Sequence, residues 1–337
     1  MKTTIYDIAK AAGVSIATVS KVINGTGRIS TDTRERVHEI MQELDYQPSV
    51  VASALTGKST FTIGLLIPDL ANPLYAEIAR SVEDRGRELG FNLVMCSTDN
   101  NPRREGDYIT FLKQKKVDGI IISTGISNEA VLQSLHTQNI PVAFVTRDHI
   151  PGMDADSVRV DDYLGGYRAA SHLLGLGHRH VAVLTEQLSL SSSSDRVRGF
   201  IHALEEAGIE EGGPVVVESF SSIEEGRRQT LELLISEDAP TALFACNDLL
   251  AIGAVQAAKE LRLTIPWDVS IIGFDNTMLA GIVDPPLTTI SQPIAEMGRR
   301  VMDLIIQEVR GEKKGKTAIV LTPELVVRQS TTFPRKV

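Results

Sequence analysis

The stretch TIYDIAKAAGVSIATVSKVINGTGRIS, residues 4–30, carries the signals for two short helices separated by a tight turn. Thr4 precedes Asp7 by three residues, which is the spacing of an N-terminal capping box with Asp in the place of Glu. Gly13 ends the first helix after two turns, and Ser15 caps the next one. The stretch therefore predicts a helix, a glycine turn and a second helix.

A third helix is expected from Ser30 or Thr31 to about residue 44. Its inward face would hold Val37, Ile40, Met41 and Leu44. Helix, tight turn and helix is the arrangement of helix-turn-helix DNA-binding modules, whose second helix enters the major groove with its first residues. A three-helix bundle with an ordinary polar face is the alternative interpretation of the same pattern.

The predicted second helix begins with side chains that suit a DNA groove. Ile16 and Ala17 fit a thymine methyl group, and Lys21 reaches a guanine edge or a phosphate. Hydroxyl, amide and basic side chains around this helix can donate to phosphates and fix the register. The DNA-binding candidates in this region are Thr4, Tyr6, Ser15, Ile16, Ala17, Thr18, Ser20, Lys21, Asn24, Arg28 and Ser30.

Charge is unevenly distributed along the 337 residues. Residues 1–60 hold seven Lys and Arg against six Asp and Glu, whereas residues 61–337 hold 27 against 37. A slightly basic head on an acidic body confines contact with phosphate to the head. The length suggests two or three domains, and 42% hydrophobic residues exclude a disordered chain.

Several other classes of protein find no support in the composition. No apolar run reaches membrane-spanning length and no signal segment opens the chain, so we expect a soluble, cytoplasmic protein. Cys96 and Cys246 are expected to be buried free thiols. His178 and His180 lack a third ligand at a suitable spacing, so no metal is expected. Neither a phosphate loop nor a dinucleotide fingerprint is present, so no cofactor is expected.

From Phe61 onward, apolar strands alternate with helical stretches, and the alternation repeats after Asp161. The expected strands are FTIGLLI, NLVMC, GIII and VAFV, then HVAVL, VVV, TALFA and VSIIGF. The expected helices lie near 74–89, 104–116, 128–138, 162–176, 195–207, 223–235 and 248–261. Apolar strands between amphipathic helices indicate parallel sheets covered on both faces. We therefore predict two doubly wound α/β subdomains with a ligand cleft beyond their strand ends.

Polar residues placed just after the strands, or at helix starts nearby, are the candidates for that cleft. Their carboxylates, amide and guanidinium suit sugar hydroxyls, which donate and accept together. Two aromatic rings could cover the C–H face of a sugar or a flat base. The effector-binding candidates are Asp69, Tyr75, Asp148, Arg196, Phe220, Asn247 and Asp275. Asp248 is interpreted as a helix cap. Arg196 could instead be a surface residue, and Asp148 could only shape a turn.

Several motifs spread along the chain are specific in combination: the 4–30 stretch, FTIGLLIPDLANPLYAEIARSVEDRGRELGF, HLLGLGHRHVAVL, ACNDLLAIGA and IPWDVSIIGFDN. Through them, nearly the whole chain resembles the LacI/GalR family of bacterial transcription regulators. The resemblance implies periplasmic-binding-protein-like subdomains of about 61–160 plus 291–322 and 161–290 plus 323–337. It also implies a helix near 293–310 that returns to the first subdomain. Arg196, Asn247 and Asp275 match positions where this family holds effectors.

The resemblance further divides the chain into a DNA-binding domain of residues 1–47, a hinge of residues 48–60, and an effector-binding and dimerisation domain of residues 61–337. Ser49 can cap a short helix through Leu55 that is too apolar for a solvated tether and marginal alone in water. In this family such helices pair and insert a leucine into the minor groove. Ala52 and Leu55 are the hinge candidates, and a flexible linker is the alternative.

Together these features predict a homodimeric repressor, without enzymatic activity, that binds a two-fold symmetric operator on double-stranded DNA. Its expected effector is a sugar or sugar derivative, and the alternatives are a purine or a partner-protein corepressor. A solute-binding protein would need an export signal, and an enzyme would need a nucleophile, metal or cofactor loop. The final residues, FPRKV, hold no apolar heptads, which favours a dimer over a coiled-coil tetramer.

Overall fold

The computed structural model describes residues 3–23, 27–46, 59–123, 134–135, 137–146, 154–209 and 213–335. The chain forms two compact units, residues 1–60 and residues 61–337, which are described separately. Asn24, Asp148, the hinge candidates Ala52 and Leu55, and most of the helix expected near 128–138 lie outside the described residues.

The first unit contains three helices in the predicted places: α1 (Ile5–Ala12), α2 (Ile16–Ile23) and α3 (Thr31–Glu43). The capping signals act as expected, because the Asp7 carboxylate accepts hydrogen bonds from the backbone N–H and the hydroxyl of Thr4 at 2.8 and 2.7 Å. Gly13 takes a φ of +63° at the end of α1. The helices enclose a small core of Ile8, Ala9, Ala12, Val19, Val22 and Val37.

One inward position of α3 is predicted wrongly. Val37 is fully buried and Ile40 and Met41 are half-buried against the core, but Leu44 is 40% exposed. The helix ends at Glu43, and Leu44 is its C-cap. The helical spacing therefore stops one residue earlier than the apolar pattern suggested.

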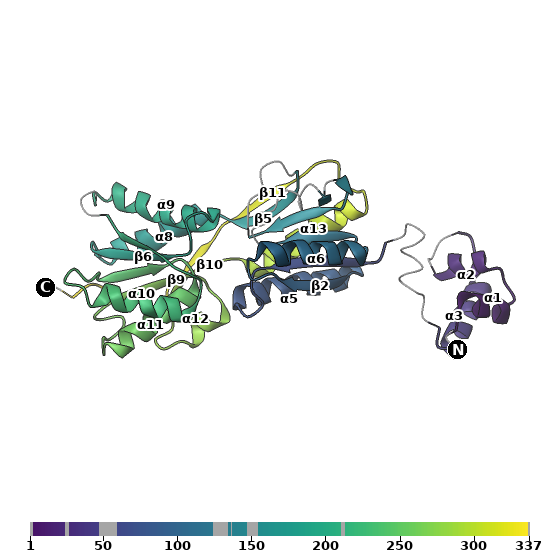
Figure 1. Ribbon diagram of the computed structural model, residues 1–337, viewed down its shortest axis with the longest axis horizontal. Coiled ribbons are helices and arrows are strands. Elements are labelled where there is room, and N and C mark those ends of the chain that lie inside the picture. Colours follow the sequence, from purple (N-terminus) through teal and green to yellow (C-terminus); the bar gives the residue numbers. More distant parts are fainter. Residues whose placement is uncertain are drawn as a thin grey trace. The chain divides into compact units, whose positions relative to one another are not determined.

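The second unit contains two six-stranded sheets covered by helices (Figure 1). The first sheet is parallel throughout and has the strand order β11-β5-β4-β3-β1-β2. Its strands are β1 (Thr62–Ile67), β2 (Asn92–Ser97), β3 (Gly119–Ile122), β4 (Val142–Val145), β5 (Asp156–Val160) and β11 (Ala318–Leu321). Helices α5 (Pro73–Leu89) and α13 (Ile294–Val309) cover one face, and α6 (Pro102–Gln114) lies on the other.

The second sheet has the order β12-β10-β9-β8-β6-β7, with β12 antiparallel to β10 and the other pairs parallel. Its strands are β6 (Val181–Thr185), β7 (Val215–Glu218), β8 (Ala242–Ala245), β9 (Ser270–Asp275), β10 (Thr288–Ser291) and β12 (Glu324–Val326). Helices α8 (Asp162–Gly175) and α9 (Ser191–Glu206) pack on one face. The other face is covered by α11 (Asp248–Glu260), flanked by α10 (Ile223–Leu234) and the short α12 (Met278–Ile282).

The chain passes between the two sheets three times. It leaves the first sheet after Val160, returns from the second after Ser291, and leaves again after Leu321. Each subdomain is therefore built from separate stretches of sequence. The carboxyl ends of several strands from both sheets lie around the region between the two subdomains.

Candidate functional site

A pocket lies between the two subdomains, at the carboxyl ends of their strands. The first subdomain contributes Pro68, Asn72, Leu74, Tyr75, Asn100, Ser123 and Thr146 to its lining. The second contributes Glu186, Leu190, Ser192, Arg196, Ser221, Asn247 and Asp275, and Gln292 lies in the segment that connects the sheets. Most of these side chains are polar, so the pocket suits a ligand rich in hydrogen-bonding groups.

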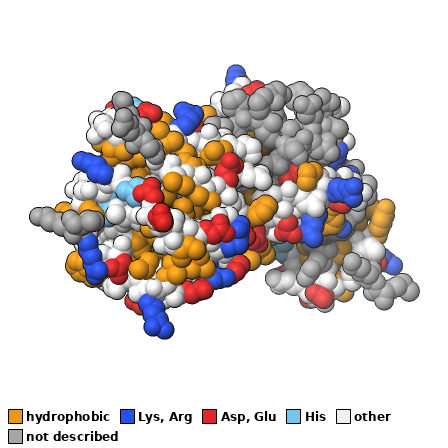
Figure 2. Space-filling model, turned by 60° about the vertical axis from the view of Figure 1, so that its left-hand side comes forward, with side chains coloured by type: hydrophobic (Ala, Val, Ile, Leu, Met, Phe, Trp, Pro, Cys, Tyr) orange, Lys and Arg blue, Asp and Glu red, His pale blue; other side chains and the backbone are white. Residues whose placement is uncertain are grey.

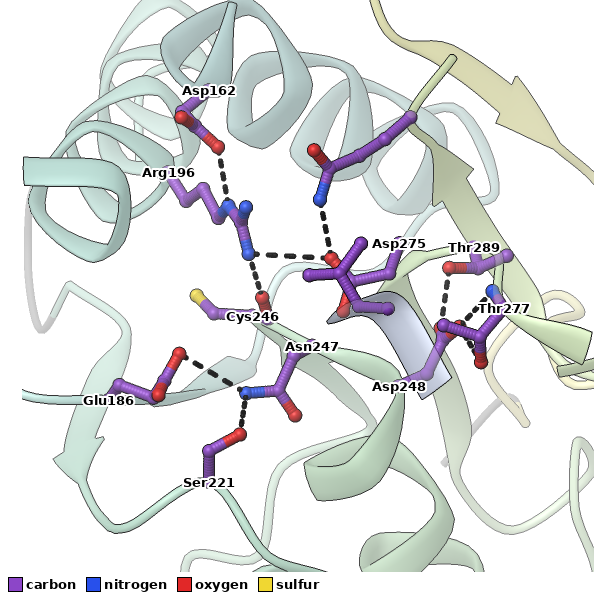
Figure 3. A network of polar contacts seen from close by, with 12 residues as sticks. Asp162, Glu186, Arg196, Ser221, Cys246, Asn247, Asp248, Asp275, Thr277 and Thr289 are labelled. Carbon is purple, nitrogen blue, oxygen red and sulfur yellow. Dashed lines mark hydrogen bonds and ion pairs between the residues drawn. The ribbon is translucent and has the colours of Figure 1, made fainter. Parts of the chain in front are cut away.

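Arg196, on α9, is at the centre of a polar network (Figure 3). Its Nε donates to Oδ1 of Asp162 at 2.7 Å, and its Nη1 donates to the Cys246 carbonyl and lies 3.8 Å from Oδ1 of Asp275. The guanidinium carbon lies 3.7 Å from the centre of the Phe274 ring. Burial opposes the charged form, but the two carboxylates outweigh it and raise the pKa of Arg196 above its ordinary value.

The position of Arg196 depends on two glycines where α8 crosses α9. A Cβ at Gly166 would lie 1.8 Å from the carbonyl oxygen of Arg196, and one at Gly199 would lie 1.9 Å from that of Tyr163. The two backbones are therefore in direct contact, which any larger residue would prevent. This close crossing holds Asp162, in the first turn of α8, against the guanidinium.

Asp275 ends β9 with a φ of 109°, a conformation that non-glycine residues rarely adopt. Its side chain is 3% exposed, and its Oδ1 accepts a hydrogen bond of 2.7 Å from Nε2 of Gln292. Burial raises the pKa of this carboxyl well above its ordinary value, although Arg196 opposes the shift. Because Gln292 follows β10, this contact joins the second sheet to a crossing segment.

Asn247 is the N-cap of α11, where its Oδ1 accepts a hydrogen bond from the backbone N–H of Leu250 at 2.9 Å. Its Nδ2 donates to Oγ of Ser221 at 3.0 Å and, more weakly, to Oε2 of Glu186 at 3.5 Å. The cap thus fixes the amide of Asn247 between Ser221 and Glu186.

Asp248, which reads as a helix cap in the sequence, is the first residue of α11 rather than its cap. Its carboxylate accepts hydrogen bonds from the Thr277 backbone N–H at 2.7 Å and from the Thr289 hydroxyl at 2.8 Å (Figure 3). Burial raises its pKa to about 6. Asp248 does not line the pocket; it ties α11 to the segment that follows β9 and to β10 itself.

The structure brings four of the seven effector candidates together: Tyr75, Arg196, Asn247 and Asp275. Asp69 does not join them, because its carboxylate is exposed and accepts the backbone N–H of Ala71 in a local turn at 2.8 Å. Phe220 does not join them either, because its side chain is 71% exposed. The surface alternative considered for Arg196 is wrong, since this residue is 8% exposed.

Sequence reasoning missed several lining residues, of which Glu186 and Gln292 are the most polar. Glu186 directly follows β6, so the rule that pointed to Asp275 also applied to it. Gln292 follows β10, which is the strand TTIS and gave no apolar signal. Among the described residues, no group of three or more His, Cys, Asp and Glu side chains is disposed to hold a metal ion.

In the first unit, the start of α2 presents an exposed surface. Ile16 is 40% exposed, Tyr6 on α1 is 67% exposed, and Ser15, Ala17 and Lys21 are also exposed. Thr4, Arg28 and Ser30 are exposed as well, whereas Thr18 and Ser20 are half-buried. Exposed apolar side chains next to a basic side chain form a surface that is suited to binding in a DNA groove.

Both parts of the chain match known protein families. Residues 4–49 match the model of the lacI family of bacterial regulatory proteins, and residues 170–331 match the periplasmic binding protein-like domain. No described helix is long and apolar enough to cross a membrane.

Known proteins resemble the chain over its full length. The HTH-type transcriptional regulator DegA of Bacillus subtilis strain 168 is 49% identical over 334 residues, which cover 98% of each chain. The lac repressor dimer bound to operator and the anti-inducer ONPF has a TM-score of 0.86 at 31% identity and covers 98% of this chain and 100% of its own. The complex of the regulator CelR with cellobiose has a TM-score of 0.75 at 28% identity with the same coverage. The chain therefore belongs to the LacI family of bacterial regulatory proteins: it is a DNA-binding transcription regulator with a periplasmic-binding-protein-like ligand domain, and it is not an enzyme.

Proposed function

We propose that this protein is a cytoplasmic repressor that binds a two-fold symmetric operator as a homodimer, and that a small carbohydrate in the cleft switches its operator affinity. The observation that carries the proposal is the polar pocket lined from both subdomains, with Arg196, Asn247 and Asp275 fixed at its centre. The structural relatives support it, since one is a repressor on its operator and another holds cellobiose.

The chemistry of the lining favours a sugar over a purine base. Amide, hydroxyl and carboxylate groups match the paired donors and acceptors of sugar hydroxyls. A purine is a flat aromatic ring that gains most from stacking between apolar or aromatic side chains. Within the described part of the chain, Tyr75 is the one aromatic side chain that lines the pocket.

A ligand that contacts both subdomains can act as a switch. It would stabilise the arrangement in which both sets of lining residues reach it, and it would shift DNA affinity only by its different affinities for the two arrangements. Besides the three chain crossings, the backbone N–H of Met278 on α12 donates to Oε1 of Glu77 on α5 at 3.1 Å. This contact between the subdomains would change with their arrangement.

Exposed apolar side chains support self-association of the body. Met278 and Ile282 on α12 are 68% and 71% exposed, and Phe220 is 71% exposed. Figure 2 shows hydrophobic side chains across one face of the protein, with Asp and Glu among them. A symmetric dimer would cover such residues and present two identical heads to the two halves of an operator.

The proposal is tested by measuring the affinity of the full-length protein for a duplex selected from a random DNA pool, by fluorescence anisotropy, with and without a panel of sugars and purines. We expect a sugar to change the affinity at least fivefold, which corresponds to about 1 kcal/mol of coupling. Asp275→Asn should remove the response and keep the affinity for DNA, because the DNA contacts lie in a separate unit.

The matched control is Asp238→Asn, since the side chain of Asp238 is 91% exposed. This variant should respond like the wild type. A response to a purine but to no sugar would refute the carbohydrate effector. A wild-type response in Asp275→Asn would refute the assignment of the cleft.

A further inference from the structure

The cleft contains more acidic than basic groups. Three carboxylates, those of Asp162, Glu186 and Asp275, are close enough to Arg196 to affect or be affected by its charge. Within the part of the chain that the structure describes, Arg196 is the only cationic side chain that lines the pocket. Asp162 and Asp275 lie within 4 Å of its guanidinium, whereas Glu186 forms no ion pair with any described residue.

The guanidinium of Arg196 is already partly engaged by groups of the protein. A phosphate or carboxylate is normally held by two parallel N–H groups of an arginine. Here Nε donates a hydrogen bond to Asp162, Nη1 donates one to the Cys246 carbonyl, and one face of the guanidinium lies on the Phe274 ring. Each pair of neighbouring N–H groups that could hold an incoming anion, Nε with Nη2 or Nη1 with Nη2, therefore includes one nitrogen that the protein already engages.

Glu186 adds a further carboxylate, one that forms no ion pair with a described residue, to the same space. It directly follows β6, its side chain lines the pocket, and its one described hydrogen bond is the 3.5 Å contact from Nδ2 of Asn247. Burial raises the pKa of its carboxyl, so its own charge is already costly at this position. A second negative charge nearby would add repulsion, whereas a sugar hydroxyl would supply the missing hydrogen-bond donor.

We propose that Glu186 determines the class of effector: it makes the cleft select an uncharged carbohydrate, by accepting a hydrogen bond from a hydroxyl group, and reject phosphorylated or acidic forms of the same sugar. This inference rests on the proposed function, because it concerns the carbohydrate that occupies the cleft.

The test compares matched pairs of probes on the full-length protein at pH 7.5 and constant ionic strength. The pairs are glucose with glucose 6-phosphate, glucose with glucuronate, and ribose with ribose 5-phosphate. Dissociation constants are measured by thermal shift and by titration calorimetry. We expect a neutral sugar to bind and its charged partner to bind at least tenfold more weakly.

Glu186→Gln keeps the shape of the side chain and removes the charge. We expect this variant to fold with a melting temperature equal to or above that of the wild type, and to bind the neutral sugar within a fewfold of it. Its preference for the neutral over the charged form should fall at least tenfold. Glu205→Gln, an exposed position on α9, removes the same charge away from the pocket and should leave the preference unchanged.

Each outcome has a distinct meaning. A sugar phosphate that binds the wild type as tightly as the neutral sugar overturns the inference and leaves a carbohydrate effector in place. An unchanged preference in Glu186→Gln overturns the role of this residue. Failure of every sugar, neutral or charged, to bind overturns both the inference and the carbohydrate effector.

Discussion

Replacing Arg196 with alanine tests whether the network in the cleft is held together by its one buried cation. The variant leaves the carboxylates of Asp162 and Asp275 at 4% and 3% exposure without their partner. Removing one member of a buried ion pair costs about 3–5 kcal/mol, because an uncompensated charge stays buried. At about 2–4 °C per kcal/mol for a domain of this size, the melting temperature should fall by roughly 6–20 °C.

Arg198→Ala is the matched control, two residues further along the same helix. The side chain of Arg198 is 66% exposed and pairs with Asp195 within one helical turn. Exposed pairs of this kind contribute about 0–1 kcal/mol, so this variant should unfold almost like the wild type. Urea titration followed by the fluorescence of Trp267, the single tryptophan, reports on the second subdomain, which contains both arginines.

The loss in Arg196→Ala should also depend on pH. Burial already raises the pKa of Asp162, and removing the guanidinium removes the largest influence that lowers it. A carboxyl whose pKa is higher in the folded than in the unfolded state loses stability as pH rises through that interval. The defect should therefore be small near pH 4 and grow toward pH 8. Equal stability of the two arginine variants, or a loss that is the same at all pH values, would refute this reasoning.

Three further predictions concern the helix crossing and the DNA-binding unit. Gly166→Ala should destabilise the protein by at least about 1–3 kcal/mol, because the new Cβ would clash with the backbone of Arg196. The control is Gly175→Ala on the same helix, whose Cβ meets nothing within 4 Å and which should be neutral or stabilising. Thermal unfolding of the two variants compares them directly. Lys21→Ala should weaken operator binding by about 1–3 kcal/mol, and competition with variant operators shows whether the loss is confined to one base position, as for a base contact, or is even, as for a phosphate contact. Leu55→Ala should lower the affinity for operator much more than for nonspecific DNA, which binds mainly through phosphates; an unchanged ratio of the two affinities would exclude a role for this leucine in specificity.

Where one local signal determines an element, the sequence predicts it well. The helices of the first unit follow from Thr4, Gly13 and Ser30, whose capping and turn chemistry acts within a few residues. The central strands of both sheets follow from runs such as GIII and ALFA, which are fully buried. The polar residues at the ends of such strands, above all Asn247 just after β8 and Asp275 at the end of β9, therefore lie at the cleft, as expected for the carboxyl ends of parallel strands.

Features that depend on distant partners were not predictable in this way. The strand β5 contains Asp156 and Ser157, which are buried because β4 and β11 pair with it from either side. The partner of Arg196 is Asp162, 34 residues earlier, and the two meet only because α8 and α9 cross at glycines. No periodicity or spacing in the sequence indicates that Asp156 and Ser157 are buried or that Arg196 pairs with Asp162.

The interleaved path of the chain has a consequence for synthesis on the ribosome. The core of the first subdomain includes Ile294, Met297, Val301 and Ile305 of α13, a helix that packs on β3, β4 and β5, which are made well over one hundred residues earlier. At about 5–20 residues per second, the apolar faces of β3, β4 and β5 wait on the order of ten to forty seconds for α13 to cover them. A nascent chain halted before α13 would therefore expose these faces to chaperones and proteases, although the residues up to Val160 are already complete. The first subdomain cannot complete its core before the second is synthesised, so we expect a fragment that ends at Val160 not to fold independently.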